Sequence, residues 1–83
     1  MLRKGEGGDQ YLEEARKWFK KAADLGRKDA MFNYAYMLKN EEGGDQDLEE
    51  ARECFKKAAE VGQINAMYNY ALMLQNGKGG PQN

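Results

Sequence analysis

The sequence predicts an all-α protein: four helices in two αα-hairpins, stacked as a short right-handed solenoid. The main observation is an internal repeat, because sliding the 83-residue chain along itself by 36 residues aligns 47 pairs, of which 29 are identical. Self-similarity at a fixed period of this size is typical of stacked repeat proteins. Within each copy, apolar residues recur at helical spacing, with glycines between the segments. We therefore predict one domain over residues 1–83, with repeat copies at 7–42 and 43–78 and the start of a third unit at 79–83.

Composition and charge are those of a globular chain. Charged residues make up 33% and hydrophobic residues 41%, and the formal net charge is −1. Interspersed charges of both signs predict no binding to nucleic acid or to an anionic membrane. No apolar run approaches the ~20 residues of a membrane span, and the opening residues lack the apolar region of a signal peptide. The single cysteine suits a reducing compartment, so we expect a cytoplasmic protein.

The chain is expected to begin on the last turn of a helix. Met1 and Leu2 repeat residues 37 and 38, which end a predicted helix of the first copy. Gly5, Gly7 and Gly8 follow, and we expect these poor helix formers to break any helix there.

The first full helix is predicted over residues 11–25. Asp9 is expected to cap it, because Tyr11 occupies the capping position that Asp47 holds in the second copy. Gly26 is expected to end it in the left-handed conformation. Phe19 should be almost fully buried, as part of an apolar stripe made of Leu12, Ala15, Trp18, Phe19, Ala22 and Ala23.

The second helix is predicted over residues 30–40, with Asp29 as its cap. Its apolar residues recur at helical spacing and therefore share one side, which should face the core. This buried side consists of Ala30, Met31, Tyr34, Ala35, Met37 and Leu38.

The second copy repeats this design from Leu48, through Gly62, Asn65 and Ala66, to about Asn76. Asp47 and Glu50 are expected to form a capping box: the aspartate accepts from the amide of Glu50, and the glutamate reaches back. The predicted core of this copy includes Phe55, Met67, Tyr70 and Met73.

These residues resemble the Sel-one-like repeat, a relative of the tetratricopeptide repeat. The first copy supplies Ala15, Trp18, Phe19, Lys21, Ala22, Ala23 and Gly26 of that pattern. A fuller stretch of it reads Ala30, Tyr34, Ala35, Leu38, Gly43, Asp47, Glu50, Ala51, Cys54, Phe55, Lys57, Ala58, Ala59 and Gly62. The resemblance implies an αα-hairpin solenoid. The chain starts and ends out of phase with the family's usual unit, so we expect a fragment or an engineered chain.

The chain departs from the family pattern at several positions. Cys54 stands where the first copy keeps Trp18, and Glu41 stands where the second copy keeps Gly77. The family's usual valine after the loop glycine is Gly44 here, which should loosen the loop.

Catalytic chemistry is not expected. Histidine is absent, and adjacent glutamates such as Glu49 and Glu50 point about 100° apart on a helix, so they cannot share a proton. Cys54 occupies the position of Trp18, which favours an inert buried thiol over a redox site. One cysteine and no histidine also make no metal site. We therefore predict no catalytic residues, no metal site and no cofactor.

The resemblance implies a binding surface on the concave side of the superhelix. In this superfamily the first helix of each unit lines that side, and an asparagine equivalent to Asn33 and Asn69 holds a peptide backbone or a terminal carboxylate. An amide both donates and accepts hydrogen bonds, which suits an extended peptide. The alternative is that these asparagines only bridge neighbouring helices. The candidate surface consists of Phe32, Asn33, Tyr36, Lys39, Asn40, Tyr68, Asn69, Leu72, Gln75 and Asn76.

We therefore predict a non-catalytic scaffold or adaptor module that binds a peptide or partner protein, with Phe32, Tyr36 and Tyr68 as exposed aromatic anchors. The alternative function is a self-assembling building block with no other ligand. Two hairpins are fewer units than a solenoid usually needs, which predicts a homo-oligomer formed head to tail or by domain swapping. Trp18, Leu72 and Met73 are expected at or near its contacts.

Overall fold

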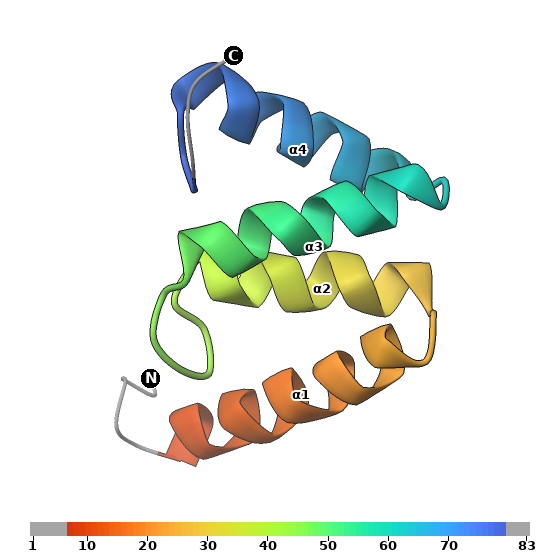
Figure 1. The fold of residues 1–83 in the computed structure, drawn as a ribbon. Coiled ribbons are helices and arrows are strands. Elements are labelled where there is room, and N and C mark those ends of the chain that lie inside the picture. Colours follow the sequence, from red (N-terminus) through yellow and green to blue (C-terminus); the bar gives the residue numbers. More distant parts are fainter. Residues whose placement is uncertain (1–6, 80–83) are drawn as a thin grey trace.

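The structure is a computed structural model that describes the backbone of residues 7–79 and the side chains of residues 11–79. It contains four helices, α1 (Gly7–Asp24), α2 (Lys28–Lys39), α3 (Leu48–Glu60) and α4 (Ile64–Asn76), and no strand within the described part. Figure 1 shows the helices stacked in chain order, each running against its neighbour. The predicted all-α helical repeat fold is confirmed. The expectations for Met1, Leu2, Gly5 and residues 80–83 lie outside the described residues.

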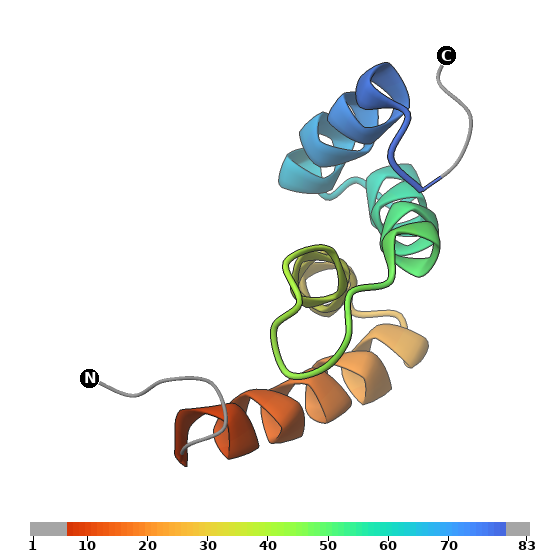
Figure 2. The same ribbon diagram turned by 90° about the vertical axis from the view of Figure 1, so that its left-hand side faces the viewer.

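Each helix packs mainly on its neighbours in the chain. α1 contacts α2, α2 contacts α3, and α3 contacts α4. Among the described residues, the two inner helices therefore have a helix on both sides, whereas α1 and α4 each have a helix on one side. Figure 2 shows α3 nearly end-on, with α2 and α4 on the same side of it.

The core lies between the two inner helices and extends to α4. Phe55 is fully buried at its centre, as the sequence predicts. Residues 11–24 of α1 contribute no fully buried side chain, because only one side of this helix is covered by another described helix. The buried cluster consists of Tyr34, Ala35, Leu38, Ala51, Phe55, Ala58, Ala66 and Met73.

Several expectations for α1 are wrong. The helix begins at Gly7 rather than Tyr11, so Gly7 and Gly8 do not break it and Asp9 lies within it. Glycine lowers helix stability without forbidding the conformation, and the first turn has few internal hydrogen bonds to lose. Phe19 is half-buried, and Trp18 is 57% exposed. The apolar stripe is present, but α2 covers only part of it.

Two burial predictions for the second copy are also wrong, because α4, like α1, is covered by only one described helix. Met67 is exposed rather than buried, and Tyr70 is only half-buried. Met73 is fully buried, because its side of α4 faces α3.

The sequence predicts the helix ends better than the helix starts. Gly26 and Gly62 have φ values of 100° and 97°, in the left-handed region expected for a residue that ends a helix. The amide of Arg27 donates to the carbonyl of Ala22, and that of Gln63 donates to Ala58, which completes the same terminal motif in both copies.

The predicted caps are partly wrong. Asp47 caps α3 as expected and accepts from the amide of Glu50 at 3.1 Å. The Glu50 carboxylate accepts instead from Tyr34, and the Asp47 amide donates to Leu38. Asp29 lies inside the first turn of α2, which begins after Arg27 without a side-chain cap.

In the second copy the cap is Gln63 rather than Asn65. The side-chain oxygen of Gln63 accepts from the amide of Ala66 at 2.8 Å.

The loop between α2 and α3 rests on α1. A Cβ atom at Gly43 would come within 3.0 Å of the carbonyl group of Leu12, so this approach requires glycine. Arg16 Nη2 donates to the carbonyl oxygen of Asp45 at 2.8 Å. The loop that contains Gly44 is therefore attached to α1, which is an anchor that the sequence reasoning did not anticipate.

Candidate functional site

Nine of the ten predicted surface residues lie on α2 and α4, which are the two helices on the same side of α3 (Figure 2), and Asn40 directly follows α2. We call this set the α2–α4 face. Tyr36 and Tyr68 are 43% and 67% exposed, and Asn33, Asn69 and Leu72 are half-buried. The face therefore offers two accessible aromatic rings and, within three residues of each, one half-buried amide.

Asn33 and Asn69 make the same hydrogen bond in the two copies. Asn33 Nδ2 donates to the carbonyl oxygen of Asp29, and Asn69 Nδ2 donates to that of Asn65, both at 2.9 Å. Each bond runs within one helix, to the residue four positions earlier. These bonds orient the amides and do not bridge neighbouring helices.

Phe32 does not have the exposed position that the sequence reasoning gave it. Its side chain is half-buried, and its ring centroid lies 5.7 Å from that of Phe55 and 6.0 Å from that of Tyr36. Because α3 lies against this side of α2, Phe32 belongs to the edge of the core and supports the Tyr36 ring.

One end of the α2–α4 face is closed by a contact between the copies. Gln63 Nε2 donates to Asp29 Oδ1 at 3.3 Å. Asp29 is in the first turn of α2, and Gln63 caps α4, so this bond links the starts of the two helices.

The other end of the face is richer in exposed polar groups. Asn40, Gln75 and Asn76 are exposed there, and Lys39 is half-buried. Asn40 Nδ2 donates to the carbonyl oxygen of Tyr36 at 3.1 Å, and Gln46 Nε2 donates to that of Lys39 at 2.8 Å.

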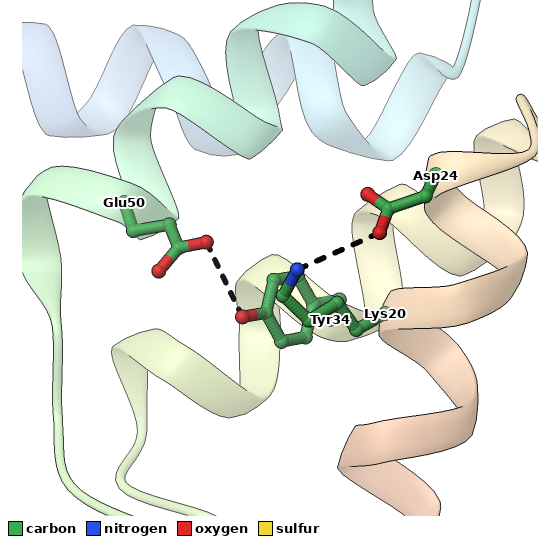
Figure 3. Close-up of polar contacts among 4 residues, drawn as sticks. All are labelled: Lys20, Asp24, Tyr34 and Glu50. Atoms are coloured by element: carbon green, nitrogen blue, oxygen red, sulfur yellow. Dashed lines mark hydrogen bonds and ion pairs between the residues drawn. The ribbon is translucent and has the colours of Figure 1, made fainter.

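A second polar group lies where α2 meets α1 and α3 (Figure 3). The Tyr34 hydroxyl donates to the Glu50 carboxylate at 3.3 Å, and Lys20 pairs with Asp24 at 3.5 Å on α1. These four residues, with Cys54, help to line a hollow of about 300 Å³. The sequence reasoning assigned Tyr34 to the core and Glu50 to a cap, and missed their contact.

The protonation of this group argues against nucleophilic chemistry. Burial, together with the charge of Glu50 and its hydrogen bond, raises the pKa of Tyr34 to about 12. Burial and the charge of Glu50 raise the pKa of Cys54 to about 11. Both groups are therefore protonated at neutral pH, whereas a nucleophile needs the ionised form.

The described residues contain no group of three or more histidine, cysteine or acidic side chains that could hold a metal ion. Within residues 7–79, no helix has both the length and the apolar character needed to cross a membrane.

Comparisons with known proteins agree with this architecture. The sequence pattern of the family described as Sel1 repeat matches residues 1–26, 28–63 and 64–83, and leaves only residue 27 unmatched. A search of curated proteins finds no match. Among solved structures, a Sel1 repeat protein from Oxalobacter formigenes is 30% identical over 86% of this chain, with a TM-score of 0.82.

This chain spans 29% of the length of the Oxalobacter formigenes protein. The central match, residues 28–63, joins α2 to α3 as one unit, so α1 and α4 belong to the units on either side of it. Proteins of this kind are in general non-enzymatic modules for protein–protein interaction. The chain belongs to the Sel1 repeat family.

Proposed function

We propose that this chain is a non-catalytic scaffold or adaptor module that binds an extended peptide segment of a partner protein on the α2–α4 face. The observation that carries the proposal is the matched pair Asn33 and Asn69. Each amide is held by the same 2.9 Å bond to its own helix at equivalent positions of the two copies. Two identically oriented amides suit a ligand that itself has a regular backbone.

The chemistry of the amides fits a peptide backbone. An asparagine side chain has two N–H donors and one acceptor oxygen. The bond to the helix uses one donor and fixes the rotation of the amide. In our proposal the second N–H donor and the oxygen bind a peptide C=O and N–H.

The exposed tyrosines supply apolar contact area beside the amides. Tyr36 lies three residues after Asn33, and Tyr68 directly precedes Asn69. Tyrosine is enriched among residues that dominate binding energy, because it buries a large ring and keeps a polar tip. The proposed ligand therefore carries apolar side chains as well as a free backbone.

The test is a peptide-display selection against the immobilised chain, followed by affinity measurement of the enriched peptides. We expect peptides that bind the parent chain and lose binding at least tenfold in the Asn33→Ala and Asn69→Ala double variant. Circular dichroism should show nearly unchanged helicity and melting temperature, because each lost bond is local and alanine favours helix.

Glu53→Ala is the control, because it truncates an exposed side chain of α3, outside the two helices that carry the candidate surface. Equal loss of binding in the control and the double variant would contradict the proposal, as would a selection that enriches no peptide. A large loss of stability in the double variant would instead show that the amides are structural.

Association of copies of this chain is a second proposed function, favoured by the surface of α4. This helix has no charged residue, and it exposes Ile64, Met67 and Tyr68. Such a surface is typical of an interaction site.

We also place the chain in a reducing compartment such as the cytoplasm, which suits the free thiol of Cys54.

A further inference from the structure

The surface of α4 differs from that of α2 in a consistent way. A shift of 36 residues pairs the charged residues Lys28, Asp29 and Lys39 of α2 with Ile64, Asn65 and Gln75 of α4. Every charge of α2 is thus replaced by a neutral side chain. We call the side of α4 that is equivalent to the α3-facing side of α2 its outer side; there Ile64 is 76% exposed, and Ala71, the equivalent of Ala35, is also exposed. The described part of the chain places no helix on this side of α4.

The α2–α3 junction shows what covers the equivalent side of α2. There Ala35 is fully buried in the cluster that contains Ala51, Phe55 and Ala58 of α3. The rings of Phe32 and Phe55 pack in a tilted arrangement with their centroids 5.7 Å apart, and the Tyr34 hydroxyl donates to Glu50. The repeat places Ala71, Tyr68 and Tyr70 of α4 at the positions of Ala35, Phe32 and Tyr34.

α1 carries the residues that would complete such a junction. Residues Ala15, Phe19 and Ala22 are identical to Ala51, Phe55 and Ala58, and Glu14 is identical to Glu50. The three α3 residues are fully buried, whereas their α1 equivalents are only half-buried. α1 is therefore an α3-type helix whose second side is not covered by any helix of residues 7–79.

The polar groups at the two sites also match. At the α2–α3 junction the glutamate accepts from a tyrosine hydroxyl of the adjoining helix. At α1 the equivalent Glu14 is exposed and accepts from Trp18 Nε1 at 3.1 Å. A carboxylate can accept further hydrogen bonds, so Glu14 has the capacity for a tyrosine hydroxyl.

We propose that α1 of a second copy docks on the outer side of α4 and reproduces the α2–α3 junction between two chains. Tyr70 then donates to Glu14 of the second copy, and Tyr68 packs against its Phe19. The contact is heterologous, since each chain uses α4 toward one neighbour and α1 toward the other, so copies add head to tail. This inference rests on the second proposed function and specifies its contact.

The experiment uses two variants that each block one side. Ala71→Arg places a long charged side chain on the outer side of α4, and Glu14→Arg reverses the charge on the outer side of α1. Both positions are exposed, so both variants should fold, which circular dichroism will check. Met67→Lys serves as a second α4 variant if Ala71→Arg loses helicity. Glu53→Gln on exposed α3 surface is the control, because it changes the net charge by the same amount as Ala71→Arg.

Sedimentation equilibrium should show mass growing with concentration for the parent and for Glu53→Gln. Ala71→Arg alone and Glu14→Arg alone should each remain monomeric. Their mixture should form a 1:1 complex that grows no further, because one intact α4 side and one intact α1 side remain. Trp18 is the only tryptophan, so its emission should shift to shorter wavelength as association covers it.

A parent that stays monomeric with unchanged Trp18 emission at every concentration overturns both this contact and the second proposed function. Association that persists in both single variants overturns this contact alone, because the copies then use another surface or exchange a hairpin. A mixture of the two variants that stays monomeric also overturns the heterologous geometry. Tyr68 belongs to both surfaces, and the asparagine variants, which leave Tyr68 intact, test peptide binding at the α2–α4 face separately.

Discussion

The hydroxyl group of Tyr34 donates a hydrogen bond to the carboxylate of Glu50 across the α2–α3 junction, over 3.3 Å. The tyrosine is buried at the point where α2 lies between its two neighbours. This contact therefore joins the apolar core to the polar hollow in which Cys54 also lies. Its protonation state is linked to the stability of the fold.

Stability should fall at alkaline pH. The pKa of Tyr34 is about 12 in the folded chain, against its usual value of 10.0. Above pH 10 the unfolded chain loses this proton first, so the contribution is fully present below pH 10 and is lost as the pH rises toward 12. The expected slope is at most about 1.4 kcal/mol per pH unit. Cys54, with a pKa of about 11 against 9.0, acts in the same direction.

Tyr34→Phe tests this linkage. At pH 7 we expect a loss of about 0.5–1.5 kcal/mol in the free energy of unfolding, since one hydrogen bond is removed. Between pH 9 and 11 the variant should lose less stability than the parent in urea denaturation. Tyr36→Phe is the control, because its ring is exposed and lysine titration affects all three chains alike. An equally steep fall in Tyr34→Phe would contradict the assignment.

Equivalent phenylalanines should differ in their contribution to stability. Phe55→Ala, at the centre of the core, is expected to lower the free energy of unfolding by about 3–5 kcal/mol, as for other buried aromatic residues. Phe19→Ala should cost less than half as much, because Phe19 is only half-buried on α1. Urea denaturation of both variants measures the difference. Equal costs would show that α1 is covered in solution, as the proposed head-to-tail contact requires at high concentration.

Glu41 is expected to be strained. It is the only described residue other than glycine with a positive φ, 60°, and it stands where the second copy has Gly77. Left-handed backbone costs roughly 1–2 kcal/mol for a residue with a side chain. Glu41→Gly should therefore be about 1 kcal/mol more stable than Glu41→Ala. Comparing the two variants removes the effect of losing the glutamate side chain, and a difference near zero would refute the prediction.

Gly43 should tolerate substitution less well than Gly26. Both have positive φ, but an added Cβ meets the Leu12 carbonyl group at Gly43 and nothing within 4 Å at Gly26. Gly26→Ala then measures the destabilisation caused by the left-handed backbone alone. Gly43→Ala should lower the free energy of unfolding by about 1–3 kcal/mol more, because the loop must also move away from α1. Thermal and urea melts of the pair give the comparison. Similar losses would mean that the loop moves away without cost.

The periodic features of the fold were predictable from sequence. The 36-residue repeat fixes the number of helices, and the left-handed ends at Gly26 and Gly62 follow from glycine after an amphipathic segment. The Asp47 cap was also predictable, because its interaction is local. Burial was less predictable: Met31 and Met67 are equivalent in sequence and both were predicted to be buried, but Met31 is half-buried and Met67 is exposed. Among the described helices, only the helix of Met31 has a neighbour on both sides. Contacts between helices decide such differences.

The candidate surface was predictable in position and less so in detail. Helical spacing places Asn33 and Tyr36 on one side of α2, but their hydrogen bonds depend on rotamers that no pattern reveals. Phe32 was misjudged because its packing on Phe55 depends on how α2 and α3 cross. Similarly, Glu50 has both a local and a distant donor within reach, and only the assembled junction selects Tyr34. The use of this surface for binding stays a prediction.

The bond from Gln63 to Asp29 has a mechanical consequence for the whole superhelix. It ties the starts of α2 and α4 together, while Lys39 and Gln75 lie at their far ends. If α4 tilts about this bond, the curvature of the helix stack changes. The distance between the C-terminal ends of α2 and α4 changes with it. An exposed neutral donor on a carboxylate contributes only about 0.5–3 kcal/mol, so this hinge point is weak. Because Ala66 and Met73 of α4 lie in the same buried cluster as Phe55, a ligand that widens the arc must also shift this part of the core.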